Sequence, residues 1–204
     1  LCEEALRLGR ILAELAPAEP EPLGLIALLE IQASRLDARR GPDDEPVLLL
    51  EQDRGRWDPL LIVRGLAALK RAEELPAPLG PYGLQAAIAA CHARALEPGD
   101  TDWIRIAALY EALAALSPSP VVELNRAVAV GMAFGPETGL ALLERIAADP
   151  ALRDYHLLPS VRGDLLARLG RAAEAAAEFR RAAELTENEP ERRLLLRRAG
   201  EAEG

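Results

Sequence analysis

Alanine- and leucine-rich stretches, each ended by proline or glycine, follow one another along nearly the whole chain. Of the 204 residues, 50% are hydrophobic but only 3% are aromatic, so alanine, leucine, isoleucine and valine must fill the core. Small apolar side chains favour closely packed helices, because alanine has the highest helix propensity and lets helix axes approach. The pattern therefore predicts an all-α fold of about ten helices in antiparallel pairs, with no significant sheet.

Proline, glycine and capping residues mark the expected helix boundaries. The clearest start is Asp58 followed by Pro59, an N-cap side chain and then proline at the first helical position. Residues 41–46 form a polar break in the pattern, and residues 47–50 are expected to be extended. Helices are expected over residues 1–15, 23–39, 59–75, 82–96, 102–116, 120–134, 136–148 and 156–187, the last with a turn at Gly170, and a final helix from near Pro190.

The first expected helix carries an apolar stripe. Its members recur at the three- and four-residue spacing that places side chains on one helix face, and they include Ala5, Leu8, Ile11, Leu12 and Leu15. The stripe predicts an amphipathic helix.

Residues 156–189 carry the strongest sign of an internal repeat. Small residues stand where paired helices would touch, and one aromatic residue would fill the space between the helices. The residues of this pattern are Gly163, Leu166, Gly170, Ala175, Phe179 and Ala182. This spacing is similar to the tetratricopeptide repeat, a helix–turn–helix unit. Residues 121–154 are a weaker copy and residues 1–39 a degenerate one, so we expect a right-handed superhelical array. A plain helical bundle is the alternative.

We expect a single all-helical domain over residues 1–204. Within it, residues 1–46 form a degenerate N-terminal helix pair, and residues 47–58 form a charged joint that contains a tryptophan. Residues 59–118 are the central helices, and residues 119–204 are tetratricopeptide-like repeats with a C-terminal capping helix.

Charge and cysteine content exclude several classes of protein. The net charge of −9 and the pI near 4.9 argue against direct contact with nucleic acid, which needs a basic face. Cys2 and Cys91 fit no metal-ligand spacing and are expected to be free thiols in a reducing compartment. No signal peptide and no membrane-spanning run is visible in the sequence, so we expect a cytoplasmic protein without membrane contact.

Residues 48–58 interrupt the apolar pattern with a cluster of charges. Three carboxylates and two guanidiniums stand within residues 51–58, beside one of the two tryptophans. Arginine suits both bidentate pairing with a carboxylate and stacking on an indole ring. A solvated loop that caps the next helix is the alternative. The candidate structural ion-pair cluster comprises Asp53, Arg54, Arg56, Trp57 and Asp58.

Four other residues are candidates for contact with a partner or ligand. Gln85 and His92 are seven residues apart and share one face of the expected helix 82–96, although a lone helical histidine also serves as a purely structural group. Asn125 and Arg126 lie on the first helix of a candidate repeat, where they suit a peptide backbone or a carboxylate. The alternative for Arg126 is a pair with Glu123.

Signatures of catalysis are missing from the sequence. It contains no nucleophile elbow, no phosphate-binding or dinucleotide-binding loop, and no paired metal ligands. We therefore expect no enzyme, no catalytic residue, no cofactor and no metal.

Several segments, in order, resemble one family. They are EQDRGRWD at 51–58, GPYGLQAAIAACHA at 80–93, DTDW at 100–103, LY at 109–110, SPVVELNRAVAV at 119–130 and YHLL at 155–158. Together they resemble the C-terminal, tetratricopeptide-like extension of a group of bacterial extracytoplasmic-function (ECF) sigma factors. The chain departs from that family at Leu50 and Arg64, where acidic residues are expected, and at Gly55, where serine is expected.

The resemblance implies a regulatory domain in promoter-specific transcription initiation by RNA polymerase. Sigma regions 2 and 4, which bind DNA and polymerase in that family, are absent from these 204 residues. The implied partners are the protein's own sigma regions 2 and 4, the polymerase core, or a regulatory protein, and DNA binding is implied for the full-length protein only. Two alternatives are a helical module that senses a small metabolite, with a pocket between residues 54–57 and 85–92, and a free-standing tetratricopeptide-type scaffold.

Overall fold

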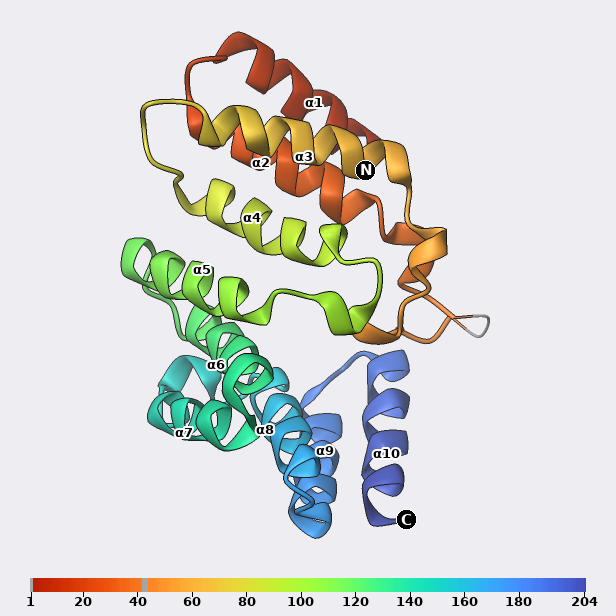
Figure 1. Ribbon diagram of the computed structural model, residues 1–204. Helices are drawn as coiled ribbons and strands as arrows, with labels where there is room; N and C mark the ends of the chain where they lie inside the picture. The colour runs from red at the N-terminus through yellow and green to blue at the C-terminus, as the bar shows by residue number, and fades with distance from the viewer. Residues whose placement is uncertain (1, 42–43) are drawn as a thin grey trace. The chain divides into compact units, whose positions relative to one another are not determined.

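A computed structural model describes residues 2–41 and 44–204 (Figure 1). These residues form ten α-helices and several short 3-10 turns, with no strand among them, which confirms the predicted all-α class. The helices are α1 (Cys2–Leu15), α2 (Pro20–Ala33), α3 (Pro59–Glu73), α4 (Pro81–Arg94), α5 (Trp103–Leu116), α6 (Pro120–Phe134), α7 (Pro136–Ile146), α8 (Leu157–Arg168), α9 (Ala172–Leu185) and α10 (Glu189–Glu203).

The chain divides into two compact units. Unit 1 comprises Leu1–Arg40 and Val47–Ser117, and unit 2 comprises Gly41–Pro46 and Pro118–Gly204. Unit 1 therefore contains α1 to α5, and unit 2 contains α6 to α10. No helix in the described part of the chain is long and apolar enough to cross a lipid bilayer.

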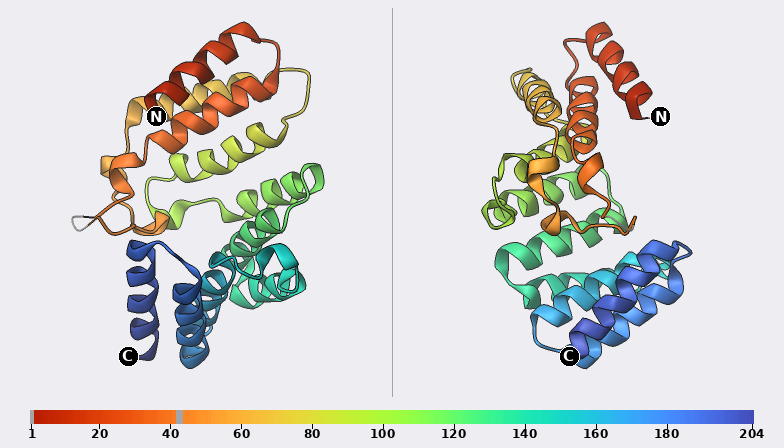
Figure 2. Two further views of the ribbon diagram at one scale, coloured as in Figure 1. Left: turned by 180° about the vertical axis from the view of Figure 1, so that it is seen from behind. Right: turned by 90° about the vertical axis from the view of Figure 1, so that its right-hand side faces the viewer.

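Helix α2 is the centre of unit 1 because it packs against α1, α3 and α4. Figure 2 shows α1 and α3 on either side of α2. Leu23, Ile26 and Ile31 of α2 are buried in the two apolar clusters that join these helices. At the contact with α4, a Cβ atom on Gly24 would lie 2.5 Å from the backbone nitrogen of Gly83. Glycine at this position is therefore what lets the two backbones meet.

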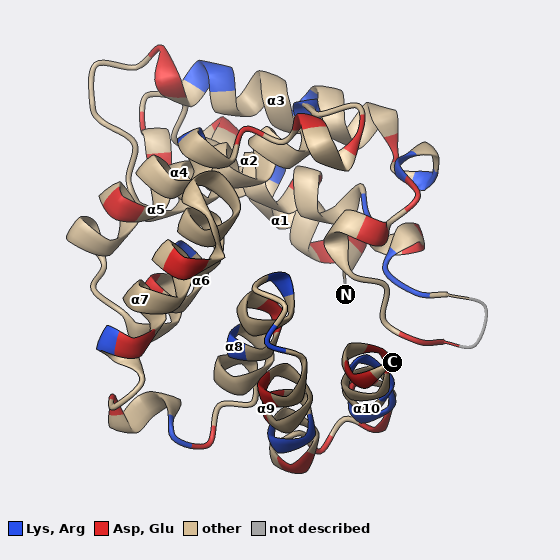
Figure 3. Cartoon of the chain, turned by 60° about the horizontal axis from the view of Figure 1, so that its bottom comes forward, with Lys and Arg blue, Asp and Glu red and all other residues tan. Residues whose placement is uncertain are grey.

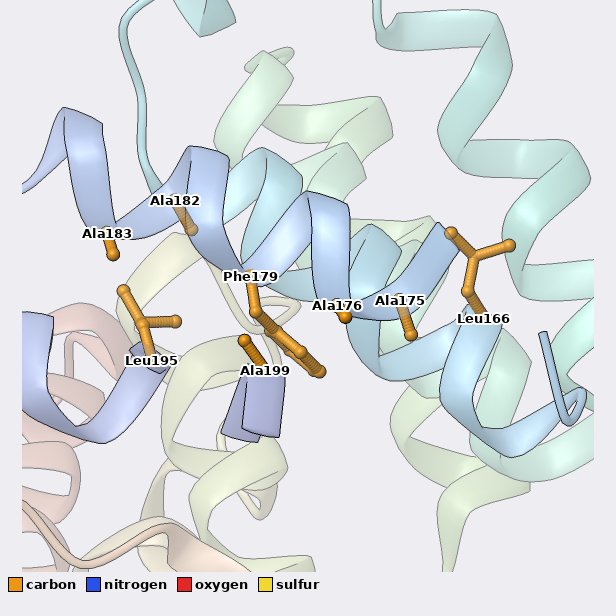
Figure 4. Packing of buried hydrophobic residues seen from close by; sticks show 8 residues of the cluster. All are labelled: Leu166, Ala175, Ala176, Phe179, Ala182, Ala183, Leu195 and Ala199. Atoms are coloured by element: carbon orange, nitrogen blue, oxygen red, sulfur yellow. The ribbon is translucent and has the colours of Figure 1, made fainter. Parts of the chain in front are cut away.

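Unit 2 contains the antiparallel pairs α6–α7 and α8–α9, and α10 packs on α9. The pair α8–α9 has the packing that its spacing predicts, because Phe179 of α9 is buried against Gly163 of α8, where a Cβ atom would lie 2.8 Å from the ring. Figure 4 shows Phe179 among Ala175, Ala176 and Ala199. Gly170 makes the turn with a φ of +72°, a conformation that favours glycine. Paired helices of this kind are consistent with a repeat-like array.

Most helix boundaries follow their local signals, with two differences. Helix α2 begins at Pro20 and ends at Ala33, whereas residues 23–39 were expected, since proline suits the first turn and the Ser34 hydroxyl bonds to the Ile31 carbonyl at the helix end. Residues 47–50 are not simply extended, because Leu49–Glu51 forms a 3-10 turn. The Asp58 cap forms as predicted, with its carboxylate accepting from the amides of Leu60 and Leu61.

Candidate functional site

The two aspartates of the charged joint 47–58 have backbone partners. The Asp53 carboxylate accepts a hydrogen bond from the Gly55 amide at 2.9 Å. The Asp58 carboxylate accepts from the Leu60 amide at 2.8 Å and the Leu61 amide at 3.1 Å, which caps α3. Both side chains therefore shape the turn and start the helix instead of pairing with an arginine.

Arg54 ties the joint to the end of α4. Its Nη1 atom donates to the carbonyl oxygens of His92 and Ala95, the latter at 2.9 Å. These carbonyls belong to the C-terminal end of α4, where the helix leaves acceptors unsatisfied and the helix dipole favours a cation. Arg54 thus acts as a C-terminal cap supplied from a distant part of the sequence.

Trp57 is the apolar centre of this arrangement, with only 5% of its surface exposed. The Arg54 guanidinium lies 4.7 Å from the centroid of its ring, and the Arg35 guanidinium lies 5.7 Å from it. Both distances fall within the range of cation–π attraction. We call Arg35, Arg54, Trp57 and His92 the arginine–tryptophan cluster.

His92 is buried in this cluster and packs edge-to-face on Trp103, with ring centroids 5.2 Å apart. Burial, together with the positive charges of Arg35 and Arg54, lowers its pKa to about 4. Burial, with the neighbouring charges of Arg39 and Arg54, also lowers the pKa of Arg35 to about 10. His92 is therefore neutral near pH 7, and the cluster carries positive charge on its arginines alone.

Ion pairs inside the joint are not found among residues 2–41 and 44–204. Arg54 has carbonyl and indole partners, and Arg56 is exposed without a carboxylate partner in this part of the chain. The five predicted residues lie together in sequence, and among the described residues Arg54 and Trp57 are joined by a contact between their side chains. Sequence reasoning missed Arg35, which stands 22 positions before Trp57 and outside the charged run.

The four candidate contact residues divide between the two units. Gln85 and His92 lie on α4 in unit 1, where the Gln85 amide donates to the Pro81 carbonyl of its own helix at 3.1 Å. Asn125 and Arg126 lie on α6 in unit 2. Asn125 is exposed, and Arg126 pairs with Glu123 at 2.9 Å, which is the alternative that its spacing allowed.

An exposed apolar face on α1 is the clearest unpartnered surface of unit 1. The side of α1 that packs on α2 consists of Leu6, Gly9 and Ala13. The apolar stripe seen in the sequence faces away from this contact. Its exposed members, which we call the α1 outer face, are Leu8 (52% exposed), Ile11 (39%), Leu12 (43%) and Leu15 (78%).

Charged residues are distributed over both units. Figure 3 shows acidic and basic positions close together on α9 and α10 of unit 2 and on α3 of unit 1. Ion pairs such as Arg180 with Glu203, at 2.5 Å, join such positions. This distribution gives no uniform basic surface on these helices for a phosphate backbone.

Comparison with known proteins finds one family model and one relative with high identity. Residues 1–73 match a family that is described only as a family of unknown function (DUF6596). An uncharacterized protein of Rhizobium meliloti (strain 1021) is 50% identical over 191 residues, which are 94% of this chain and 44% of that protein. No solved structure matches the chain. The chain thus spans less than half the length of its curated relative and shares its first three helices with the family of unknown function.

Proposed function

We propose that this chain is the regulatory, protein-interaction C-terminal domain of an ECF sigma factor, a cytoplasmic protein that directs RNA polymerase to specific promoters. Two findings support the proposal. The chain resembles such domains over several segments in order, and its relative from Rhizobium meliloti has room for further domains because 191 aligned residues are only 44% of its length. The all-helical fold also fits a binding domain.

The α1 outer face is the observation that carries the proposal. Four large apolar side chains on one face of one helix form a contiguous patch of the kind that marks a protein interface. Burial of one leucine side chain stabilises a contact by about 1.5–3 kcal/mol. The partners we propose are the protein's own sigma regions 2 and 4, the polymerase core, or a regulatory protein.

Transcription by the full-length protein tests this function. The gene product that contains residues 1–204 is purified with Leu8→Glu and Leu12→Glu, and promoter-specific initiation is measured with polymerase core. A partner bound to the α1 outer face would bury both leucines, so replacing them by charges should weaken the contact by about a hundredfold and abolish the regulation of initiation by this domain. Leu116→Glu, at an exposed leucine of α5, is the matched control and should behave as wild type.

Two results count against the proposal in different ways. A full-length protein that neither binds polymerase core nor initiates at a promoter is not a sigma factor. A full-length protein that is active and regulated in the same way with and without Leu8→Glu and Leu12→Glu does not use the α1 outer face, provided that circular dichroism shows the variant folded.

The scaffold alternative is favoured by one observation, the tetratricopeptide-like packing of Phe179 against Gly163. The metabolite alternative at residues 54–57 and 85–92 is disfavoured. Arg54 stacks on the Trp57 ring and His92 packs on the Trp103 ring, so the side chains that would line such a pocket already pack on aromatic rings. A full-length protein with no polymerase-binding activity but with specific peptide partners would favour the scaffold.

A further inference from the structure

A groove runs between α1 and α3 over α2, away from the arginine–tryptophan cluster. Its volume is about 370 Å³, within the range of small-molecule sites. Helix α1 provides one wall, α3 provides the other, and α2 forms the floor, because α2 packs against both. The lining residues are Arg10, Ala13, Glu14, Leu23, Ile26, Glu30, Arg64, Ala68 and Arg71.

Glu30 places a buried carboxylate in this groove. Only 2% of the residue is exposed, and its Oε1 atom accepts one hydrogen bond from Nε of Arg10 at 2.8 Å. Its Oε2 atom is buried and has no hydrogen-bond partner among residues 2–41 and 44–204. A buried carboxylate oxygen without a donor is costly, so this atom is suited to a ligand that donates hydrogen bonds. Arg10, which donates to the other oxygen, has 42% of its side chain exposed.

Two guanidiniums face the same groove from α3. Arg64 and Arg71 are seven residues apart, on one side of the helix, and both are exposed. Neither has a carboxylate partner in the described part of the chain. Arg64 is next to Gly65, where a Cβ atom would lie 3.3 Å from the Glu30 Cβ atom. Arg64 and Glu30 therefore belong to neighbouring positions of α3 and α2, and both line the groove.

Apart from the exposed carboxylate of Glu14 on α1, the remainder of the groove is apolar. Ala13 of α1, Leu23 and Ile26 of α2 and Ala68 of α3 line it between the charged ends. A ligand that fits this pattern has a hydrogen-bond-donating cation for Glu30, an anion for Arg64, and an apolar part that lies on Ile26 and Leu23. These three features occur together in an α-amino acid with an apolar side chain.

We propose that the groove between α1 and α3 binds a small zwitterion of the α-amino acid class with an apolar side chain. The ammonium group donates to Glu30, the carboxylate accepts from Arg64, and the side chain covers the apolar floor. Arg71, farther along α3, closes the far end of the groove. This inference does not depend on the sigma-factor proposal, since it concerns residues of α1, α2 and α3 alone.

Calorimetric titration of the full chain with four probes tests each part of this recognition. L-Leucine carries all three features, whereas 4-methylpentanoate lacks the ammonium, 3-methylbutylamine lacks the carboxylate, and glycine lacks the apolar side chain. We expect saturable binding of L-leucine and at least about tenfold weaker binding of each of the other probes, because a site built to pair a polar group rejects analogues without it.

Variants place the binding in this groove. Arg64→Gln should weaken L-leucine binding at least about tenfold, and Glu30→Gln should abolish the preference for L-leucine over 4-methylpentanoate. Arg145→Gln, at an exposed arginine of α7, is the matched control and should bind as wild type. If Glu30→Gln does not fold, the comparison of L-leucine with 4-methylpentanoate on wild type tests the ammonium contact alone.

Three outcomes would overturn the proposal. They are no saturable binding of L-leucine at concentrations up to about 10 mM, equal binding of L-leucine and the probe without the ammonium group, and L-leucine binding that Arg64→Gln leaves unchanged.

Discussion

At the scale of single residues, Arg54 binds backbone carbonyls and an indole ring, although the charge pattern around it predicts an ion pair. It stands in a run of acids and bases that is typical of ion pairs, yet its partners are two carbonyls at the end of α4 and the ring of Trp57. The carbonyls are 38 and 41 positions away in sequence. A guanidinium serves this purpose because its planar fork donates to several acceptors while its face stacks on an indole.

Arg54→Ala should therefore destabilise unit 1. The change leaves the His92 and Ala95 carbonyls without their donor and removes the stacking on Trp57, which we expect to cost about 2–3 kcal/mol in the free energy of unfolding. Arg56→Ala, two positions away at an exposed residue, should change it by less than about 0.5 kcal/mol. Urea unfolding followed by circular dichroism measures both. Equal effects of the two substitutions would contradict this role for Arg54.

His92 should make stability depend on pH. Its pKa is lowered from 6.5 in the unfolded chain to about 4 in the folded one, so the unfolded state binds more protons between these values. Stability is then fully present above about pH 6.5 and is lost as the pH falls towards 4, by up to about 3 kcal/mol. The free energy of unfolding is measured between pH 4 and 7.

Other groups also titrate over this range, so the test is the difference between wild type and His92→Gln. The slope of stability against pH should become smaller in His92→Gln, whereas His156→Gln, at the other histidine, should keep the wild-type contribution of His92. An identical slope in wild type and His92→Gln would show that the buried imidazole does not control it.

At the scale of elements, close helix contacts depend on glycine. Gly163 lies under Phe179, and Gly24 meets Gly83 where α2 and α4 cross. The spacing of Gly163 and Phe179 predicted their contact, because both belong to one local helix–turn–helix unit. The meeting of Gly24 and Gly83 joins helices far apart in sequence and had no such signal.

Gly163→Ala should loosen the α8–α9 pair. The added Cβ atom would lie 2.8 Å from the Phe179 ring and 3.2 Å from the Ala175 carbonyl, so we expect a loss of about 1–3 kcal/mol in stability from overpacking. Gly200→Ala in α10 is the control with the opposite sign. No atom lies within 4 Å of its added Cβ, and alanine favours a helix over glycine by up to about 1 kcal/mol. Thermal unfolding compares the two, and a Gly163→Ala protein as stable as wild type would contradict tight packing at this point.

In helix α1, the periodicity of apolar residues predicts the helix but not which of its sides is buried. Its apolar stripe correctly predicted a helix, but the buried side is the one with Leu6, Gly9 and Ala13. Small residues were enough for the contact with α2, since Gly9 lets the Ile26 side chain approach. The large residues of the stripe were left exposed as the α1 outer face.

At the scale of the whole molecule, a chain with net charge −9 contains groups of cations that local acids do not neutralise. One is the arginine–tryptophan cluster, and another is the pair Arg64 and Arg71 on the wall of the groove. Neither could be seen in the sequence, where Arg35, Arg54 and Arg71 each stand within two residues of an acidic residue. The proposed partner surface and the proposed ligand groove both lie on helices that match the family of unknown function.

The sequence by itself determined the all-α class, the number of helices and most of their ends. Helix propensity, the Asp58 cap and the Gly170 turn act over a few neighbouring residues, so they can be read without knowing the fold. Only the tertiary structure decided which side of α1 is buried, that Arg54 binds carbonyls of α4, and that Glu30 and Arg64 share a groove. These features depend on which distant helices pack together, and periodicity defines the faces of a helix without naming the neighbour that each face will meet.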